Sequence, residues 1–293
     1  MLTTNVSHRP DQGAVHGAKK MLIPTRAQLL PIVLASVGIL WPGALPADLV
    51  AVRYQEGFLH GFLLLRSEQG AVIAAGDWTQ IAKGDRVTSD LAFRFEDGSL
   101  YQETTVFSQR GRFQLLKYHL VEKGPAFKHP TESWLNVSTG QFTVRYQDDD
   151  GKEKNSSERV QIPADVANGM VITLLKNLPM NAQQIMLSMV VATPKPRTIK
   201  LAISYQGEES FLVGGASRKA RHYLVKVELG GVRGVVAPLV NKQPPDSHIW
   251  ILAGEFPVFV RSVGALDEGG PIWTIEQTSP AWPEKSGGTN SPK

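Results

Sequence analysis

Residues 163–178 (PADVANGMVITLLKNL) are the one stretch of this chain with a convincing helical pattern. Apolar side chains recur there at spacings of three and four, so that one helical face carries Val166, Met170, Leu174, Leu175 and Leu178. Asp165 suits the first turn of a helix, and Pro179 would end it because a residue before proline is pushed out of the α region. The sequence therefore predicts one amphipathic helix over residues 163–178.

Most of the remaining chain alternates between apolar and polar side chains with a period of two, which is typical of half-buried strands. Asp97-Gly98, directly after one such segment, is a strong hairpin signal. About a dozen strands are predicted, at residues 50–58, 62–65, 71–75, 86–95, 100–107, 113–121, 142–147, 185–192, 199–205, 223–229, 249–252, 258–263 and 272–275. A lone apolar helix among so many strands predicts a mainly β protein, with one strongly curved antiparallel sheet, a half-barrel, around the helix.

Residues 21–47 have the three-part layout of a secretory signal peptide. Positive charge precedes a short apolar run at residues 29–40, and Ala47 supplies a small residue for cleavage. A membrane anchor is the alternative, but the apolar run is short and is flanked and interrupted by prolines. We expect export, to the periplasm, with cleavage after Ala47; either Met1 or Met21 is compatible with the start of the chain.

The chain divides into four predicted parts. Residues 1–20 are polar and aperiodic, which indicates disorder or an upstream extension before the signal segment. Residues 48–278 hold all the predicted elements and are expected to form one half-barrel domain, since large all-β domains run to roughly 200–250 residues. Residues 279–293 are rich in proline, glycine, serine and lysine and are predicted to be a disordered tail.

Charge and cysteine content exclude several classes of function. The chain carries a net charge of +4, of which residues 1–47 contribute +3 through four basic residues and one acidic residue. The remaining body is close to neutral, so nucleic acid is not an expected partner. The chain contains no cysteine, which excludes disulfides, thiolate catalysis and cysteine-ligated metals.

No catalytic or metal-binding motif emerges from the sequence. Histidines occur without i, i+2 or i+4 pairs at positions 8, 16, 60, 119, 129, 222 and 248. The Asp-Asp-Asp-Gly run at residues 148–151 lacks a carboxylate where a calcium loop needs its first one, because Tyr146 stands there. Asp77, Asp85 and Glu103 would suit general acid–base work, but their spacing does not single them out. We expect no enzyme, no metal and no cofactor.

Methionine is concentrated around the predicted helix: four of the six methionines fall within twenty residues, at positions 170, 180, 186 and 189. Methionine is flexible and polarizable, and it often lines surfaces that accept varied apolar shapes. The candidate ligand-binding residues are therefore Met170, Leu174, Met186 and Met189, between helix and sheet. The alternative is that they fill an ordinary core, and burial of the methionines is expected in either case.

Residues 52–54, the helix over residues 166–178, and residues 249–252 leading through a turn into residues 257–260 together resemble a family of uncharacterised exported bacterial proteins. The resemblance is best over residues 50–277. The fold of that family is similar to the lipoprotein carriers of the Gram-negative periplasm, in which one curved sheet grips a helix and an apolar concave face can hold acyl chains. The resemblance implies architecture and transfers no catalytic residue.

Three functions compete on these grounds. The favoured one is an exported binding protein for an apolar ligand, such as a lipid or acylated partner, held between the concave sheet and the helix; it requires an unfilled pocket. The second is a non-catalytic structural or interaction protein of the cell envelope, which requires a filled groove and an exposed apolar patch or sheet edge. The third is a hydrolase with acidic rim residues meeting in a cleft. Expected partners are a lipid or acylated ligand or an envelope protein, with transient membrane contact.

Overall fold

Fourteen strands and one helix make up the part of the chain that the computed structural model describes, namely residues 49–147, 150–179, 182, 184–193, 195–213, 215–228, 244–267 and 269–278. The strands are β1 (Leu59–Arg66), β2 (Val72–Lys83), β3 (Arg86–Phe95), β4 (Leu100–Ser108), β5 (Gln114–Lys123), β6 (Thr131–Asn136), β7 (Gln141–Gln147), β8 (Glu153–Arg159), β9 (Gln184–Thr193), β10 (Lys195–Val213), β11 (Ala216–Glu228), β12 (Ser247–Leu252), β13 (Val258–Gly264) and β14 (Trp273–Thr278). The predicted extension and signal segment (residues 1–47), the predicted tail and Met180 lie outside the described residues.

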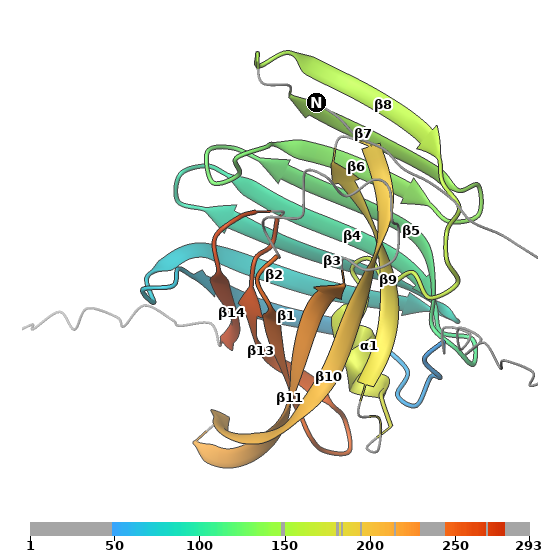
Figure 1. The fold of residues 1–293 in the computed structure, drawn as a ribbon. Helices are drawn as coiled ribbons and strands as arrows, with labels where there is room; N and C mark the ends of the chain where they lie inside the picture. The colour runs from blue at the N-terminus through green and yellow to red at the C-terminus, as the bar shows by residue number, and fades with distance from the viewer. Residues whose placement is uncertain are drawn as a thin grey trace, which may run out of the picture. The chain divides into compact units, whose positions relative to one another are not determined.

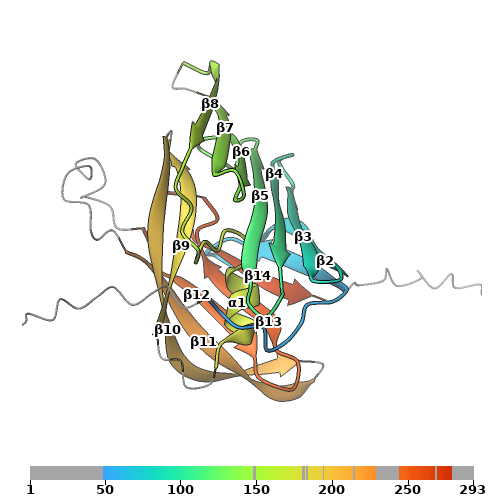
Figure 2. The ribbon, with the colours of Figure 1, turned by 90° about the vertical axis from the view of Figure 1, so that its right-hand side faces the viewer.

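All fourteen strands belong to one antiparallel sheet, in the order β8-β7-β6-β5-β4-β3-β2-β1-β14-β13-β12-β11-β10-β9. Two meanders, β1 to β8 and β9 to β14, join where β1 pairs with β14, with Leu65 opposite Ile275. The sheet is curved and does not close, since β8 and β9 form its two edges (Figures 1 and 2). This confirms the predicted mainly β fold of one curved antiparallel sheet around a helix, with fourteen strands rather than about a dozen.

The hairpin predicted at Asp97-Gly98 is confirmed as the turn between β3 and β4. Gly98 has a φ of 84°, a backbone conformation that costs glycine little because it has no Cβ. The Asp97 carboxylate accepts a hydrogen bond from the Ser99 N–H at 2.8 Å, which stabilises the turn. The turn sets the register in which β4 continues the meander.

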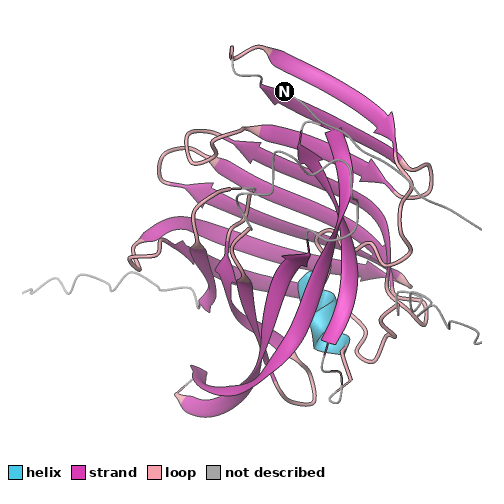
Figure 3. Cartoon of the chain, viewed as in Figure 1, coloured by secondary structure: helices cyan, strands magenta, loops and turns pink. Residues whose placement is uncertain are grey.

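The helix is shorter than predicted. α1 spans only Val171–Asn177, and residues 163–170 form turns and one bridge to β9 instead (Figure 3). Two features prevent a longer helix: Gly169 has a φ of 65°, and Val166 forms a parallel bridge with Ser188. α1 ends where expected, because Leu178, before Pro179, is extended. Among the described residues, no helix is long and apolar enough to span a bilayer.

The predicted apolar face is nevertheless core. We call the face of the sheet toward α1 the inner face and the opposite one the outer face. All five predicted face residues are buried: Val166, Met170, Leu174, Leu175 and Leu178. They pack into one hydrophobic cluster with large inner-face side chains, among them Leu65, Phe93, Phe107, Phe142 and Phe259. The prediction that the helix face belongs to the core is confirmed, although Val166 reaches the core from a turn and not from a helix.

One predicted strand is absent from the structure, and two strands of the structure were not predicted. Residues 50–58, predicted as a strand, contain only an isolated bridge from Ala51 to Arg112. β6 was missed, because no strand was predicted between residues 121 and 142. β8 was missed because its sequence, Glu-Lys-Asn-Ser-Ser-Glu-Arg, contains no apolar residue and therefore no hydrophobic period.

Candidate functional site

Contacts with the segment at residues 49–58 hold α1 against the inner face. The Lys176 ammonium lies 2.6 Å from a carboxylate oxygen of Glu56, and both side chains are buried. The Asn177 side-chain oxygen accepts hydrogen bonds from the backbone N–H groups of Arg53 and Tyr54, at 2.9 and 2.7 Å. The backbone of Glu56 is in turn bound by the Gln109 amide at 2.8 and 3.0 Å. The helix is therefore fixed by a buried, largely satisfied polar network rather than laid loosely over the sheet.

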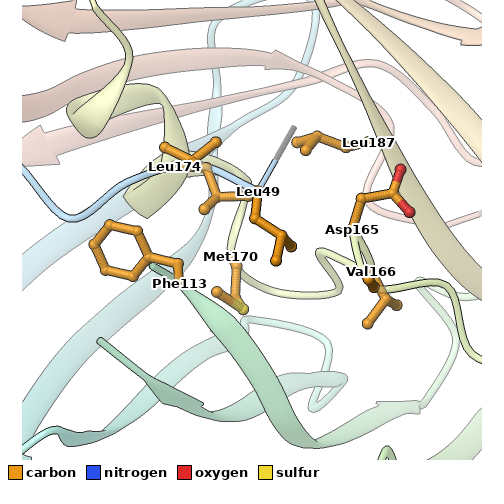
Figure 4. A pocket seen from close by; sticks show the side chains of 9 residues that line it. Leu49, Phe113, Asp165, Val166, Met170, Leu174 and Leu187 are labelled. Atoms are coloured by element: carbon orange, nitrogen blue, oxygen red, sulfur yellow. The ribbon is translucent and has the colours of Figure 1, made fainter. Parts of the chain in front are cut away.

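A small apolar recess lies between α1, this segment, β5 and β9 (Figure 4). Its lining is formed by Leu49, Val50, Phe113, Ala164, Asp165, Val166, Met170, Leu174 and Leu187. The cavity measures about 10 Å³, room for about one water molecule. Even with the open solvent at its mouth the empty space is about 240 Å³, below the roughly 300–1,000 Å³ of small-molecule pockets. The described side chains around this recess therefore leave no room in it for an acyl chain.

The four predicted ligand-binding residues do not come together. Met170 and Leu174 line the recess. Met189 is partly buried against the core, and Met186 is 38 % exposed on the opposite face of β9 from Leu187, so the expected burial of Met186 was wrong. Met186 points away from the core because side chains alternate along a strand, and the loop before α1 covers that side of β9 only at Ser188 and Val190, which are buried.

The loop before α1 covers the free edge of β9. The Ala167 N–H donates to the Ser188 carbonyl and the Ser188 N–H to the Asp165 carbonyl, at 2.8 and 3.1 Å. The Asn168 side chain continues this pairing by binding both backbone groups of Val190. Lys200 reinforces it by donating to the carboxylate of Asp165 at 2.9 Å. Ser188 also contacts Lys200, at 2.7 Å, but it is fully buried and its hydroxyl donates to Asp165, so the group stabilises an edge and offers no accessible nucleophile.

A cluster of acidic and tyrosine side chains occupies the inner face of β4 and β5. Tyr101 stands opposite Glu122, and Glu103 lies one inward position further along β4. Burial raises the pKa of Glu122 to about 8, and the nearby Asp267 and Glu103 carboxylates add to this. Burial also raises the pKa of Glu103, against a hydrogen bond with Tyr118 that lowers it. Glu122 is therefore mostly protonated at neutral pH, as expected for a carboxyl group inside a core.

The carboxylates considered for acid–base work from the sequence do not meet. Glu103 belongs to the acidic cluster, but Asp77 is on the outer face beside His60 and Arg94. Asp85 is in the turn after β2 and binds Arg110. Glu122 was not identified from the sequence, although its position could have been inferred: Glu122 and Tyr118 are an even number of residues apart in β5 and so lie on the same buried side of the strand.

Two of the histidines that are scattered in the sequence meet on the outer face. His222 and His248 are 2.8 Å apart through Nε2 and Nδ1, and His222 stacks on Trp250. The other ring nitrogen of His222 lies 3.1 Å from Glu209, so the three groups do not converge on one point. Within the described ranges, no group of three or more histidine or acidic side chains could hold a metal ion.

Exposed apolar side chains occur where β1 begins and β2 ends, two of them on the outer face and one just before β1. Phe58, just before β1, is 81 % exposed, while Phe62 is 38 % and Ile81 49 % exposed. The His60 ring contacts Phe62, with ring centroids 4.7 Å apart, and Phe58 directly precedes the strand that carries both. We call Phe58, His60, Phe62 and Ile81 the outer patch. The sequence assigned Phe58 and Phe62 to strands, but the alternation of apolar and polar residues did not show which of them would remain exposed.

Comparisons with known proteins give a similarity to a solved structure. No protein-family model matches the chain, and no curated protein matches it. Among solved structures the chain is similar to the crystal structure of a beta-barrel-like protein of a domain of unknown function, DUF1849, from Brucella abortus. The TM-score is 0.42 and the sequence identity 7 %, over 76 % of this chain and 98 % of that chain.

Proposed function

We propose that this protein is an exported, non-catalytic interaction protein of the cell envelope, in which the half-barrel is a rigid support and the outer patch binds a partner protein. Export rests on the signal-like residues 21–47. The observation that carries the proposal is the contrast between the two faces: the recess beside α1 on the inner face measures about 10 Å³, while phenylalanine and isoleucine side chains are exposed outside.

The chemistry of the outer patch indicates the kind of partner. Two phenylalanine rings and one isoleucine offer apolar area, and His60 adds a polar atom that lies 3.4 Å from Asp77. Interfaces are typically built from such aromatic anchors with polar groups at the rim. The complementary surface is an apolar protein segment, and contact with it would remove the exposed Phe58 ring from water.

Site-specific photo-crosslinking in cells tests this function. A photoreactive amino acid at position 58 should give a defined protein adduct, which the Phe62→Ser substitution weakens because it removes the neighbouring ring. The matched control is position 212, where Leu212 is equally exposed, at 80 %, but lies at the far hairpin of β10 and β11. No adduct at position 58, or the same adducts from both positions, would contradict the proposal.

A second candidate is the apolar-ligand carrier, favoured by one specific observation. The recess is lined by eight apolar residues and one carboxylate, and two of the predicted ligand-binding residues, Met170 and Leu174, are among them. Holding an acyl chain would require Leu49 and Val50, or the loop before α1, to move away from the sheet. Titration with a fluorescent fatty acid decides: saturable, near-stoichiometric binding with an altered Kd in Met170→Ala supports the carrier, and no saturable binding excludes acyl chains.

A further inference from the structure

The two edge strands of the sheet differ in whether another part of the described chain covers them. The edge at β9 is covered by the loop at residues 165–168, which satisfies backbone groups of Ser188 and Val190. Among the described residues, β8 pairs with β7 alone, and six of its seven residues are exposed. An edge strand of this kind presents a row of N–H and C=O groups to which another strand can pair.

We propose that β8 is the binding site for a second copy of this chain, which pairs antiparallel with β8 across a two-fold axis at Ser156 and so joins the two sheets edge to edge. The partner is a second copy because the sequence of β8 is complementary to itself. A two-fold axis through Ser156 places Glu153 opposite the partner's Arg159, and Lys154 opposite the partner's Glu158. Symmetry repeats both contacts, so four pairs of opposite charge form.

Other registers lose this complementarity. A shift by one residue in one direction places Glu153 opposite the partner's Glu158, and a shift in the other direction places Lys154 opposite the partner's Arg159. Like charges directly opposite each other on adjacent strands are destabilising. A shift by two residues leaves no charged residue of β8 opposite another; in one direction it brings Lys152, just before the strand, opposite the partner's Glu158, which gives two pairs of opposite charge in place of four. In-register parallel pairing would place every charge opposite itself. The charge pattern therefore selects one register, whereas an edge with charges of one sign would only repel.

The charged pairs form on both faces of the joined sheet. Lys154 and Glu158 stand opposite Tyr146 and Phe142 of β7 and so belong to the inner face, like the buried Phe142. Glu153 belongs to the outer face, where Arg145 lies 3.1 Å from its carboxylate. Because charged pairs form on both faces of the joined sheet, the two strands cannot easily twist relative to each other. Because the contact is only seven residues long, we expect a reversible dimer that weakens with salt.

Cysteine cross-linking reports the two-fold axis directly, since the chain has no cysteine of its own. Antiparallel partners have Cα atoms about 4.5–5.5 Å apart, within the range that a disulfide spans. The full chain carrying Ser156→Cys should form a covalent dimer under mild oxidation, faster than the same chain carrying Ser217→Cys, an exposed serine at the start of β11. Equal rates at the two positions would mean random collision and would overturn the proposal.

Charge reversal tests the register in the otherwise unaltered chain, by sedimentation of wild type and variants over a range of concentrations at low salt. Lys154→Glu should weaken dimerisation at least about tenfold, because two glutamate pairs then face each other. Lys154→Glu with Glu158→Lys should restore it, because the exchanged charges are again opposite. Lys83→Glu, an equal change of net charge at the end of β2, should leave the dimer unaltered. A wild type that stays monomeric at every concentration, or a double variant as weak as the single one, would overturn the proposal.

Discussion

The ammonium of Lys176 and the carboxylate of Glu56 meet at 2.6 Å in the interior, 120 residues apart in the chain. Both side chains are less than a tenth exposed. Each charge would be costly to bury alone, so the pair ties the position of α1 to that of the segment before β1. This contact makes the helix a permanent part of the core.

Removing one member of this pair should therefore be severe. Lys176→Met leaves Glu56 buried without its partner, and we expect a loss of about 3–5 kcal/mol in the free energy of unfolding, measured with denaturant. The double variant Lys176→Met, Glu56→Leu should recover most of the loss. Lys226→Met is the control: it breaks an exposed pair with Asp246 at 3.4 Å and should cost no more than about 1 kcal/mol. Equal losses at the two lysines would show that the helix is peripheral.

Alanine substitution should lower the stability of the protein by different amounts at two of the predicted ligand-binding methionines, Met170 and Met186. Met170 is 1 % exposed, so Met170→Ala opens a cavity, and we expect a cost of about 2–5 kcal/mol. Met186 is 38 % exposed, and Met186→Ala should cost less than about 1 kcal/mol. Thermal or denaturant unfolding of both variants under one condition makes the comparison. A larger loss at Met186 would contradict its place on the open face of β9.

The fold was predictable where burial leaves a periodic pattern. The alternation from Arg86 to Phe95 is β3, and Asp97-Gly98 is its turn. β8 could not be predicted, because a strand held by backbone pairing and polar side-chain contacts to β7 needs no apolar side chain. Val166 fitted a helical period by coincidence, since its place depends on a bridge to Ser188 that no local pattern encodes.

The candidate site was predictable only in part. Met170 and Leu174 were found because helical spacing points both of them to the core. The exposure of Met186 could not be predicted, since residues 185–192 are almost all apolar and no alternation with polar residues shows which side of the strand faces solvent. The exposure of Phe58 depends on residues 50–58 leaving the sheet, which their alternating sequence argues against. Tertiary contacts decided each of these positions.

Gly169 and Gly151 should respond differently to alanine. Both have positive φ, 65° and 74°, so alanine is strained at either position, by roughly 1–2 kcal/mol. A Cβ at Gly169 would also overlap the Thr105 hydroxyl and press on Glu103, whereas a Cβ at Gly151 meets open space. We expect Gly169→Ala to lose about 1–3 kcal/mol more than Gly151→Ala, in denaturant unfolding. Similar losses would show that the loop before α1 is not tightly packed on β4.

The acidic cluster should make stability fall as pH rises. Burial holds the pKa of Glu122 at about 8 in the folded protein, against 4.5 for an ordinary glutamate, so the folded state binds this proton more tightly than the unfolded chain. The stabilisation is complete below about pH 4.5 and is lost progressively as pH rises through 8, by at most about 1.4 kcal/mol per pH unit for one group. Glu122→Gln cannot ionise, so its free energy of unfolding should fall less between pH 5 and pH 8.5 (about the span of the wild-type titration). Glu96→Gln, at an exposed position after β3, should follow the wild type. If the Glu122→Gln and wild-type curves stay parallel over this range, the carboxyl is already ionised in the folded protein and the inner face is not the neutral core described above.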